Sequence, residues 1–109
     1  MTEKTKKYLV DIIISIELID DFLGNTITFS DYERDFKTKS AVERQLIIIG
    51  EITNKIKNIE VIELSHSKEI INFRNRLVHA YDSIDDSIVW AIKINHLPQL
   101  KIEVEALLK

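Results

Sequence analysis

Residues 73–81 read Phe-Arg-Asn-Arg-Leu-Val-His-Ala-Tyr, and this stretch organises the interpretation of the whole chain. A helix that turns by about 100° per residue places four side chains on one apolar stripe: Ile70, Phe73, Leu77 and Tyr81. The polar side chains gather on the opposite side: Asn72, Asn75, Arg76 and His79. Arg74 departs from this division, because it falls within the apolar stripe, about 140° around the axis from His79. Such a break indicates a functional site, or an arginine paired with a buried carboxylate.

Apolar residues recur at helical spacing both before and after this stretch. They predict helices near residues 3–23 and 41–58, a third from 65 or 67 to 80, and further helices around 88–94 and after Pro98. Gly24 and Asn25 predict the end of the first helix, and Asp85 predicts a cap. Residues 30–33 (Ser-Asp-Tyr-Glu) predict a capping box at which a short helix or turn begins. We therefore expect an all-α, up-down helical bundle of four to five helices in a single domain, residues 1–109.

Two features of the predicted helices suggest close neighbours. The apolar face of the first helix is widened by Val10, Ile14 and Leu18, which favours contact with two helices or with a second chain. Gly50 falls in the middle of a predicted helix, where glycine costs about 1 kcal/mol relative to alanine. We therefore expect another helix to approach closely at Gly50.

The composition of the 109 residues excludes several classes of protein. There is no cysteine, which excludes disulfide frameworks and thiolate metal sites. The net charge of −3 argues against a protein that coats nucleic acid non-specifically, so any nucleic acid must meet a local basic site. Charged residues interrupt the first apolar run, and we expect neither a signal peptide nor a membrane span.

The sequence motifs leave metal-free acid–base chemistry as the candidate reaction. His66, His79 and His96 lack metal-ligand spacing, and no glycine-rich phosphate loop or nucleophile elbow is present, so we expect neither a metal nor a cofactor. An imidazole can move protons near neutral pH, and a guanidinium can bind a phosphate through two N–H groups. These groups suit RNA cleavage through the 2′-hydroxyl, with His79 moving the proton, Arg74 binding the phosphoryl oxygens and Asn75 orienting His79 or the substrate.

The angle between Arg74 and His79 favours a site built from two copies of the chain that face each other across a two-fold axis. Two other interpretations remain open. In one, the chain is a non-catalytic module whose Arg74/His79 cleft binds a nucleotide or docks a partner nucleotidyltransferase. In the other, it is a structural dimeric bundle in which Arg74 pairs with a carboxylate such as Glu51.

The order of residues 74–85 closely resembles the signature of HepT-like HEPN toxins, which is Arg, four residues, His, any residue, Tyr. The flanking sequence agrees as well. Residues 41–44 and 48–51 resemble the helix that precedes the signature in the family, and residues 88–90 and 97–100 resemble its C-terminal part.

This resemblance implies a helical homodimer with metal-independent endoribonuclease activity, in which Arg74, Asn75 and His79 lie in the cleft between protomers. It also implies that the chain is the toxin of a type VII-like toxin–antitoxin pair. The implied antitoxin is an MntA-like minimal nucleotidyltransferase, which neutralises the toxin by adding AMP to Tyr81. The family is prokaryotic, and the implied location is the cytoplasm.

Overall fold

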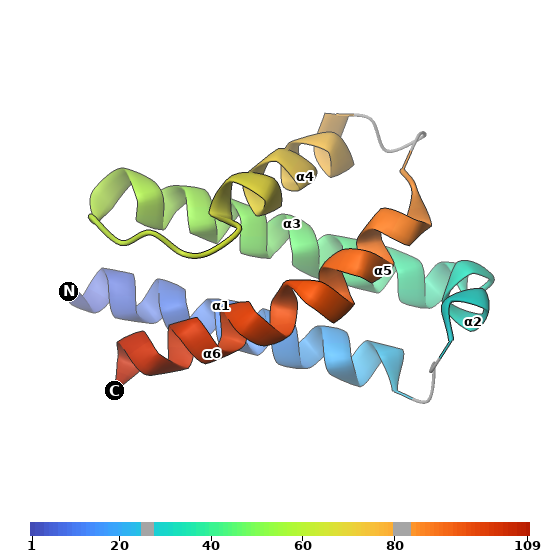
Figure 1. Cartoon of the computed structure of the whole chain (residues 1–109), viewed down its shortest axis with the longest axis horizontal. Helices are drawn as coiled ribbons and strands as arrows, with labels where there is room; N and C mark the ends of the chain where they lie inside the picture. Colours follow the sequence, from blue (N-terminus) through green and yellow to red (C-terminus); the bar gives the residue numbers. More distant parts are fainter. Residues whose placement is uncertain (25–27, 80–83) are drawn as a thin grey trace.

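The computed structural model describes residues 1–24, 28–79 and 84–109, and within these ranges all regular structure is helical. The helices are α1 (Glu3–Leu23), α2 (Phe29–Glu33), α3 (Phe36–Ile59), α4 (Ser67–His79), α5 (Asp86–Asn95) and α6 (Leu97–Leu108). Successive long elements run in opposite directions, and both termini lie at the same end of the molecule (Figure 1). The predicted all-α up-down bundle is confirmed.

The helix count exceeds the expected four to five by one short helix. A short helix, α2, lies in the connection between α1 and α3. As predicted, the last segment is divided into two helices, α5 and α6, which meet at His96. Pro98 occupies the first turn of α6, where its missing N–H leaves no helical hydrogen bond unmade.

The helix ends follow from capping side chains. Gly24 ends α1 with a φ of +45°, a left-handed conformation that glycine adopts without a Cβ clash. Asp85 caps α5, as predicted, by accepting a hydrogen bond from the Ser87 N–H at 2.9 Å. Two predicted starts are wrong. Thr28 rather than Ser30 caps α2, and α3 begins at Phe36 rather than near Ala41, because Asp35 accepts a hydrogen bond from the Thr38 N–H at 3.1 Å.

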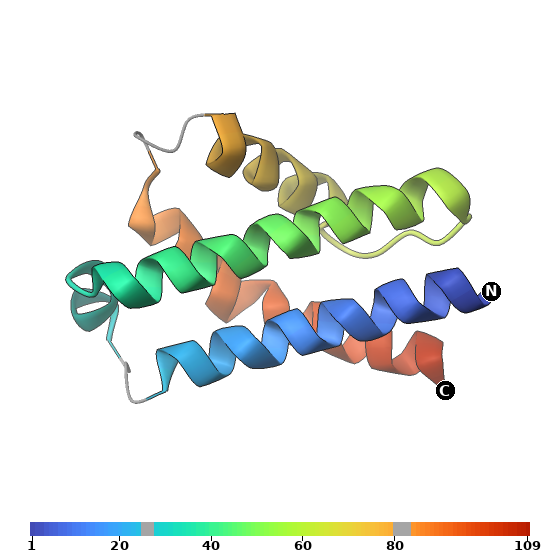
Figure 2. The same ribbon diagram turned by 180° about the vertical axis from the view of Figure 1, so that it is seen from behind.

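The core forms along the predicted apolar stripes. α1 contributes five buried side chains to it: Leu9, Ile12, Ile16, Ile19 and Leu23. The apolar residues that recur at helical spacing along α3 are also buried: Val42, Leu46, Ile49, Ile52 and Ile56. α1 packs against both α3 and α6, as its broad apolar face suggested. Two of the three residues that widen this face, Val10 and Ile14, nevertheless stay exposed. Figure 2 shows α4, α3 and α1 in sequence across one face, with α6 behind them.

No helix in the described ranges is both long enough and apolar enough to cross a lipid bilayer.

Candidate functional site

Arg74 is positioned by the close contact between α4 and α3. The predicted stripe of α4 is buried at Ile70, Phe73 and Leu77. Arg74 lies beside that stripe, directly over Gly50 of α3. A Cβ at position 50 would come within 2.3 Å of the Arg74 Cβ and 2.7 Å of its Cγ. Gly50 therefore makes room for the Arg74 side chain, which confirms the predicted close approach of a second helix.

The guanidinium of Arg74 is held by two hydrogen bonds. Its Nη2 donates to Glu51 Oε1 at 3.0 Å, and its Nη1 donates to Asn75 Oδ1 at 3.0 Å. The Nε atom is buried and has no partner among the described residues. The Arg74 and Glu51 side chains retain 28% and 42% of their exposure, so the head group stays accessible to solvent. The pairing of Arg74 with Glu51 is thus present, but it is not a fully buried ion pair.

The same residues border a pocket of about 340 Å³ between α3 and α4. It is lined by four residues of α3 and three of α4: Gly50, Glu51, Asn54, Lys55, Ile71, Arg74 and Asn75. Two cationic side chains oppose one carboxylate, so the pocket carries a net positive charge. The amide groups of Asn54 and Asn75 add hydrogen-bond donors. This combination suits an anionic group such as a phosphate.

Lys55 and Asn54 were not among the predicted site residues. Both lie within four residues of Glu51 on the same helix, and such neighbours share a helix surface. The expected pair of Arg74 and Glu51, combined with helical spacing, would therefore have pointed to Asn54 and Lys55 as neighbours of the site.

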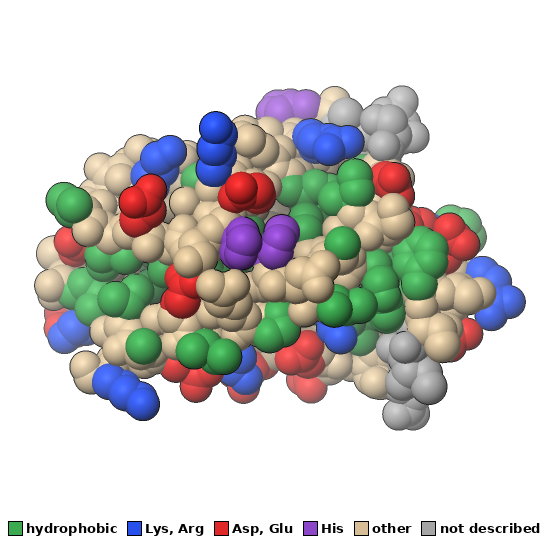
Figure 3. Space-filling view, in the orientation of Figure 1, with side chains coloured by type: hydrophobic (Ala, Val, Ile, Leu, Met, Phe, Trp, Pro, Cys, Tyr) green, Lys and Arg blue, Asp and Glu red, His purple; other side chains and the backbone are tan. Residues whose placement is uncertain are grey.

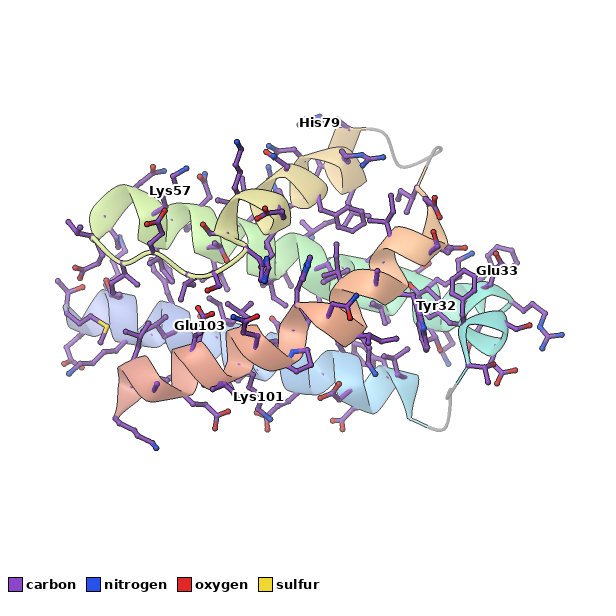
Figure 4. The ribbon with its side chains drawn as sticks, viewed as in Figure 1. Tyr32, Glu33, Lys57, His79, Lys101 and Glu103 are labelled. Atoms are coloured by element: carbon purple, nitrogen blue, oxygen red, sulfur yellow. The ribbon has the colours of Figure 1, made fainter. Side chains whose placement is uncertain are left out.

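His79 lies apart from this pocket. It is the last residue of α4 and is exposed, and Figure 4 shows it pointing away from the other helices. The helix carries it about 7.5 Å along the axis from Arg74 and about 140° around it. One chain thus brings Arg74 and Asn75 together, but it does not bring His79 into the same pocket. Tyr81, the expected modification site, lies outside the described residues.

The other two histidines form a separate cluster. The rings of His66 and His96 stack with their centroids 4.2 Å apart, and histidine side chains are visible near the centre of the face shown in Figure 3. Burial lowers the pKa of His96, and the neighbouring His66 lowers it further. Within the described ranges, no group of three or more His, Cys, Asp or Glu side chains is arranged to hold a metal ion.

The comparisons with known proteins decide the family. The family model described as HepT-like ribonuclease matches residues 12–107. The chain belongs to the HepT-like ribonuclease family.

Individual relatives cover nearly the whole chain. It is 38% identical to a protein of Thermococcus cleftensis named "Probable ribonuclease HepT", over all of both chains. It is 32% identical to a protein of Methanocaldococcus jannaschii that is named as a putative RNase, over 95% of this chain and 87% of the relative. A protein of Caldanaerobacter subterraneus with a name of the same kind is 32% identical, over 95% of this HepT-like chain and 94% of the relative. No solved structure matches the chain significantly.

Proposed function

We propose that this HepT-like chain is a metal-independent endoribonuclease and the toxin of a type VII-like toxin–antitoxin pair. The observation that carries the proposal is the position of Arg74, which is fixed over Gly50 at the edge of a positively charged pocket. Membership of a ribonuclease family supports RNA as the substrate that fills this pocket. The whole chain would act as one HEPN-like domain in the cytoplasm.

In the proposed reaction, His79 takes the proton of a ribose 2′-hydroxyl, and the 2′-oxygen attacks the adjacent phosphorus. The bond from phosphorus to the 5′-oxygen breaks, and His79 gives the proton to that oxygen, which leaves a cyclic phosphate on one product. Arg74 binds the phosphoryl oxygens as negative charge develops on them. Asn75 already accepts a hydrogen bond from Arg74 and orients it.

The separation of Arg74 and His79 supports a homodimer as the active unit. Because the two side chains diverge on one helix, a site that uses both is completed when a second α4 faces the first across a two-fold axis. Val78, beside His79, is exposed on the same part of α4 and is available for such a contact.

The proposed control is modification of Tyr81 by an MntA-like minimal nucleotidyltransferase. The tyrosine oxygen attacks the α-phosphorus of ATP, AMP is transferred to it, and pyrophosphate leaves. Tyr81 is two residues from His79 in the sequence, so a bulky anionic group there would repel RNA phosphates from the catalytic histidine.

The test combines RNA cleavage with the intact mass of the protein. We expect the chain to cleave single-stranded RNA in the presence of EDTA, and His79→Ala to abolish cleavage while the oligomeric state and the helical circular dichroism are kept. Co-expression with an adjacent nucleotidyltransferase should add whole AMP units to the wild type but not to Tyr81→Phe, with loss of cleavage only in the former. Undiminished cleavage by His79→Ala would overturn the catalytic assignment. Tight nucleotide or nucleotidyltransferase binding without any RNA turnover would favour the non-catalytic module.

A further inference from the structure

Three side chains from two helices meet beside the Arg74 pocket. Lys4 and Tyr8 lie one turn apart on α1, and Lys55 lies on α3. The Lys4 Nζ is 5.9 Å from the centre of the Tyr8 ring, and the Lys55 Nζ is 5.7 Å from it. Two ammonium groups thus lie over one aromatic ring.

This cluster continues the pocket across the molecule. Lys55 belongs to both, because it also lines the pocket that contains Arg74 and Asn75. The three helices involved, α4, α3 and α1, follow one another across the face shown in Figure 2. Lys55 therefore links the Arg74 pocket to Tyr8, and Tyr8 in turn lies under Lys4.

Lys4 differs from the neighbouring lysines of α1 in charge pairing. Lys6 and Lys7 on α1 form ion pairs with Glu3 and Asp11, at 3.3 and 2.6 Å. Lys4 and Lys55 form no ion pair with any described residue. In a chain of net charge −3, this leaves a local strip of positive charge that the protein itself does not neutralise.

We propose that Lys4, Tyr8 and Lys55 form a track for single-stranded RNA that continues from the Arg74 pocket. The proposal rests on the ribonuclease function proposed above and names the surface that holds the strand beyond the cleaved bond. Lys55 and Lys4 contact phosphates, and a base stacks on the Tyr8 ring.

Charge and aromatic chemistry together favour this occupant. A positively charged groove that follows the backbone, with aromatic rings on which bases stack, is the arrangement by which proteins bind single strands without reading their sequence. At nearly 6 Å, the two ammonium groups lie at the outer limit of cation–π contact with Tyr8. They can therefore turn towards phosphates while a base occupies the ring face.

The experiment compares variants of the track with a matched lysine elsewhere on α3. The track variants are Lys4→Gln, Lys55→Gln, Tyr8→Leu and Tyr8→Phe. Lys57→Gln is the control, because Lys57 lies two residues from Lys55 and lines a different pocket with residues of the α3–α4 connection. Binding of a labelled single-stranded oligonucleotide is measured by fluorescence anisotropy on a His79→Ala background, and cleavage is measured on the wild-type background.

Each variant has its own expected signature. Each lysine variant should reduce the slope of log affinity against log salt by about 0.7, which corresponds to the loss of one phosphate contact on a single strand. Tyr8→Leu should weaken binding by about tenfold without changing that slope, while Tyr8→Phe should retain most of the affinity. In the cleavage assay, the Lys4 and Tyr8 variants should raise KM for the oligonucleotide and leave the cleavage of a dinucleotide unchanged, because a dinucleotide does not reach these two residues. Lys55→Gln should raise KM for both substrates, because Lys55 also lines the Arg74 pocket.

The outcomes separate this proposal from the proposed function. If the wild type cleaves RNA but the track variants bind and cleave as Lys57→Gln does, the track is wrong and the ribonuclease stands. If the wild type neither binds nor cleaves RNA, the proposed ribonuclease function is wrong, and the track is overturned with it. If the track variants keep their RNA affinity but lose binding to a nucleotidyltransferase, the surface binds protein and the track is overturned. Each lysine variant should melt at the same temperature as Lys57→Gln. Tyr8 packs against the core, so the affinity of Tyr8→Leu is compared with that of Tyr8→Phe at a temperature where both have the helical circular dichroism of the wild type.

Discussion

The guanidinium of Arg74 donates a 3.0 Å hydrogen bond to the carboxylate of Glu51, twenty-three residues away in the sequence. Both side chains remain partly exposed, so solvent screens the pair, and its contribution to stability is about 1 kcal/mol or less. The pair is therefore better understood as a device that orients Arg74 than as a source of stability.

A first prediction follows for Glu51→Gln. The amide oxygen can still accept a hydrogen bond from Arg74 but carries no charge, so Arg74 should keep its position and gain positive potential. We expect an unchanged melting temperature within about 1 kcal/mol of stability, and RNA binding as tight as in the wild type or tighter. Arg74→Lys, which loses the planar fork of donors, should lose cleavage at similar stability. A large loss of stability in both variants would instead support the purely structural interpretation of this pair.

A second prediction concerns the position that receives Arg74. Gly50→Ala should gain about 1 kcal/mol of helix propensity, but its Cβ would collide with the Arg74 Cβ at 2.3 Å. Separating two packed helices costs typically 1–3 kcal/mol or more, so we expect a net loss of stability and a lower melting temperature. Ser40→Ala, at an exposed position of α3, is the control and should not lower it. A Gly50→Ala protein at least as stable as the wild type would show that α3 and α4 separate without cost.

A third prediction tests whether each site draws on two protomers. If the protein is the proposed homodimer, Arg74→Ala and His79→Ala should each be inactive alone. After they are mixed and allowed to exchange, half of the dimers are hybrids, and one site in each hybrid has both residues intact, so activity should return to about a quarter of the wild-type value. Cleavage is measured before and after exchange. If Arg74 and His79 of one chain serve the same site, mixing restores nothing.

A fourth prediction concerns the ion pair between α3 and α5. The Lys39 Nζ lies 2.7 Å from Asp86 Oδ2, and these side chains are only 14% and 17% exposed. Burial raises the pKa of Glu43, and the nearby Asp86 raises it further, so Lys39→Met would leave two carboxylates facing each other without a cation. We expect a loss of about 2 kcal/mol or more, measured by urea unfolding. Lys7→Met, which breaks the exposed Lys7–Asp11 pair, should cost about 0.5 kcal/mol. Equal losses in the two variants would contradict the assigned burial of the Lys39 pair.

A fifth prediction concerns stability in mild acid. The pKa of His96 is lowered by burial and by His66, while Glu69 opposes the shift. The unfolded chain then binds a proton at His96 near pH 6.5, whereas the folded chain binds it only at lower pH. The free energy of unfolding should therefore fall as the pH drops below about 6.5, and thermal melts between pH 7.5 and 5 would measure the fall.

His96→Phe provides the control for the pH scan, because it keeps a stacking ring opposite His66 but removes the titrating group. It should flatten the profile. Glu103, whose pKa is lowered by hydrogen bonds from Ser65, loses its contribution only below about its ordinary value of 4.5, outside the scan. Glu43 has a raised pKa and acts with the opposite sign, so Glu43→Gln should steepen the fall. An unchanged profile in His96→Phe would remove His96 as the cause.

Much of the fold could be predicted from the sequence because its helices carry regular apolar stripes. The buried positions of α1 and α3, the end of α1 at Gly24 and the cap at Asp85 follow from local rules and were confirmed. The starts of α2 and α3 were not predicted correctly. Several residues near them, including Thr28, Ser30, Asp31 and Asp35, are able to cap a helix, and only the path of the chain selects among them.

The candidate site was predictable in its residue types but not in its arrangement. The sequence indicated Arg74, Asn75 and His79, and it named Glu51 as a carboxylate that could pair with Arg74. It did not indicate that Lys55 joins this pocket or that Tyr8 lies beside Lys55. The contact between Tyr8 and Lys55 joins residues of different helices, and periodicity within one helix does not determine which faces meet.

Because of the contact at Gly50, the residue at position 50 limits which residues position 74 can hold, and the reverse is also true. While α3 and α4 keep their present separation, only one of the two positions has room for a Cβ. A chain that drifts to alanine at 50 could regain its packing through a suppressor, Arg74→Gly, but this change removes the guanidinium as well. Reversion would then require both codons to change, and arginine could return at 74 without the Cβ clash only after glycine had returned at 50. Loss of the arginine by this route would be difficult to undo in a lineage.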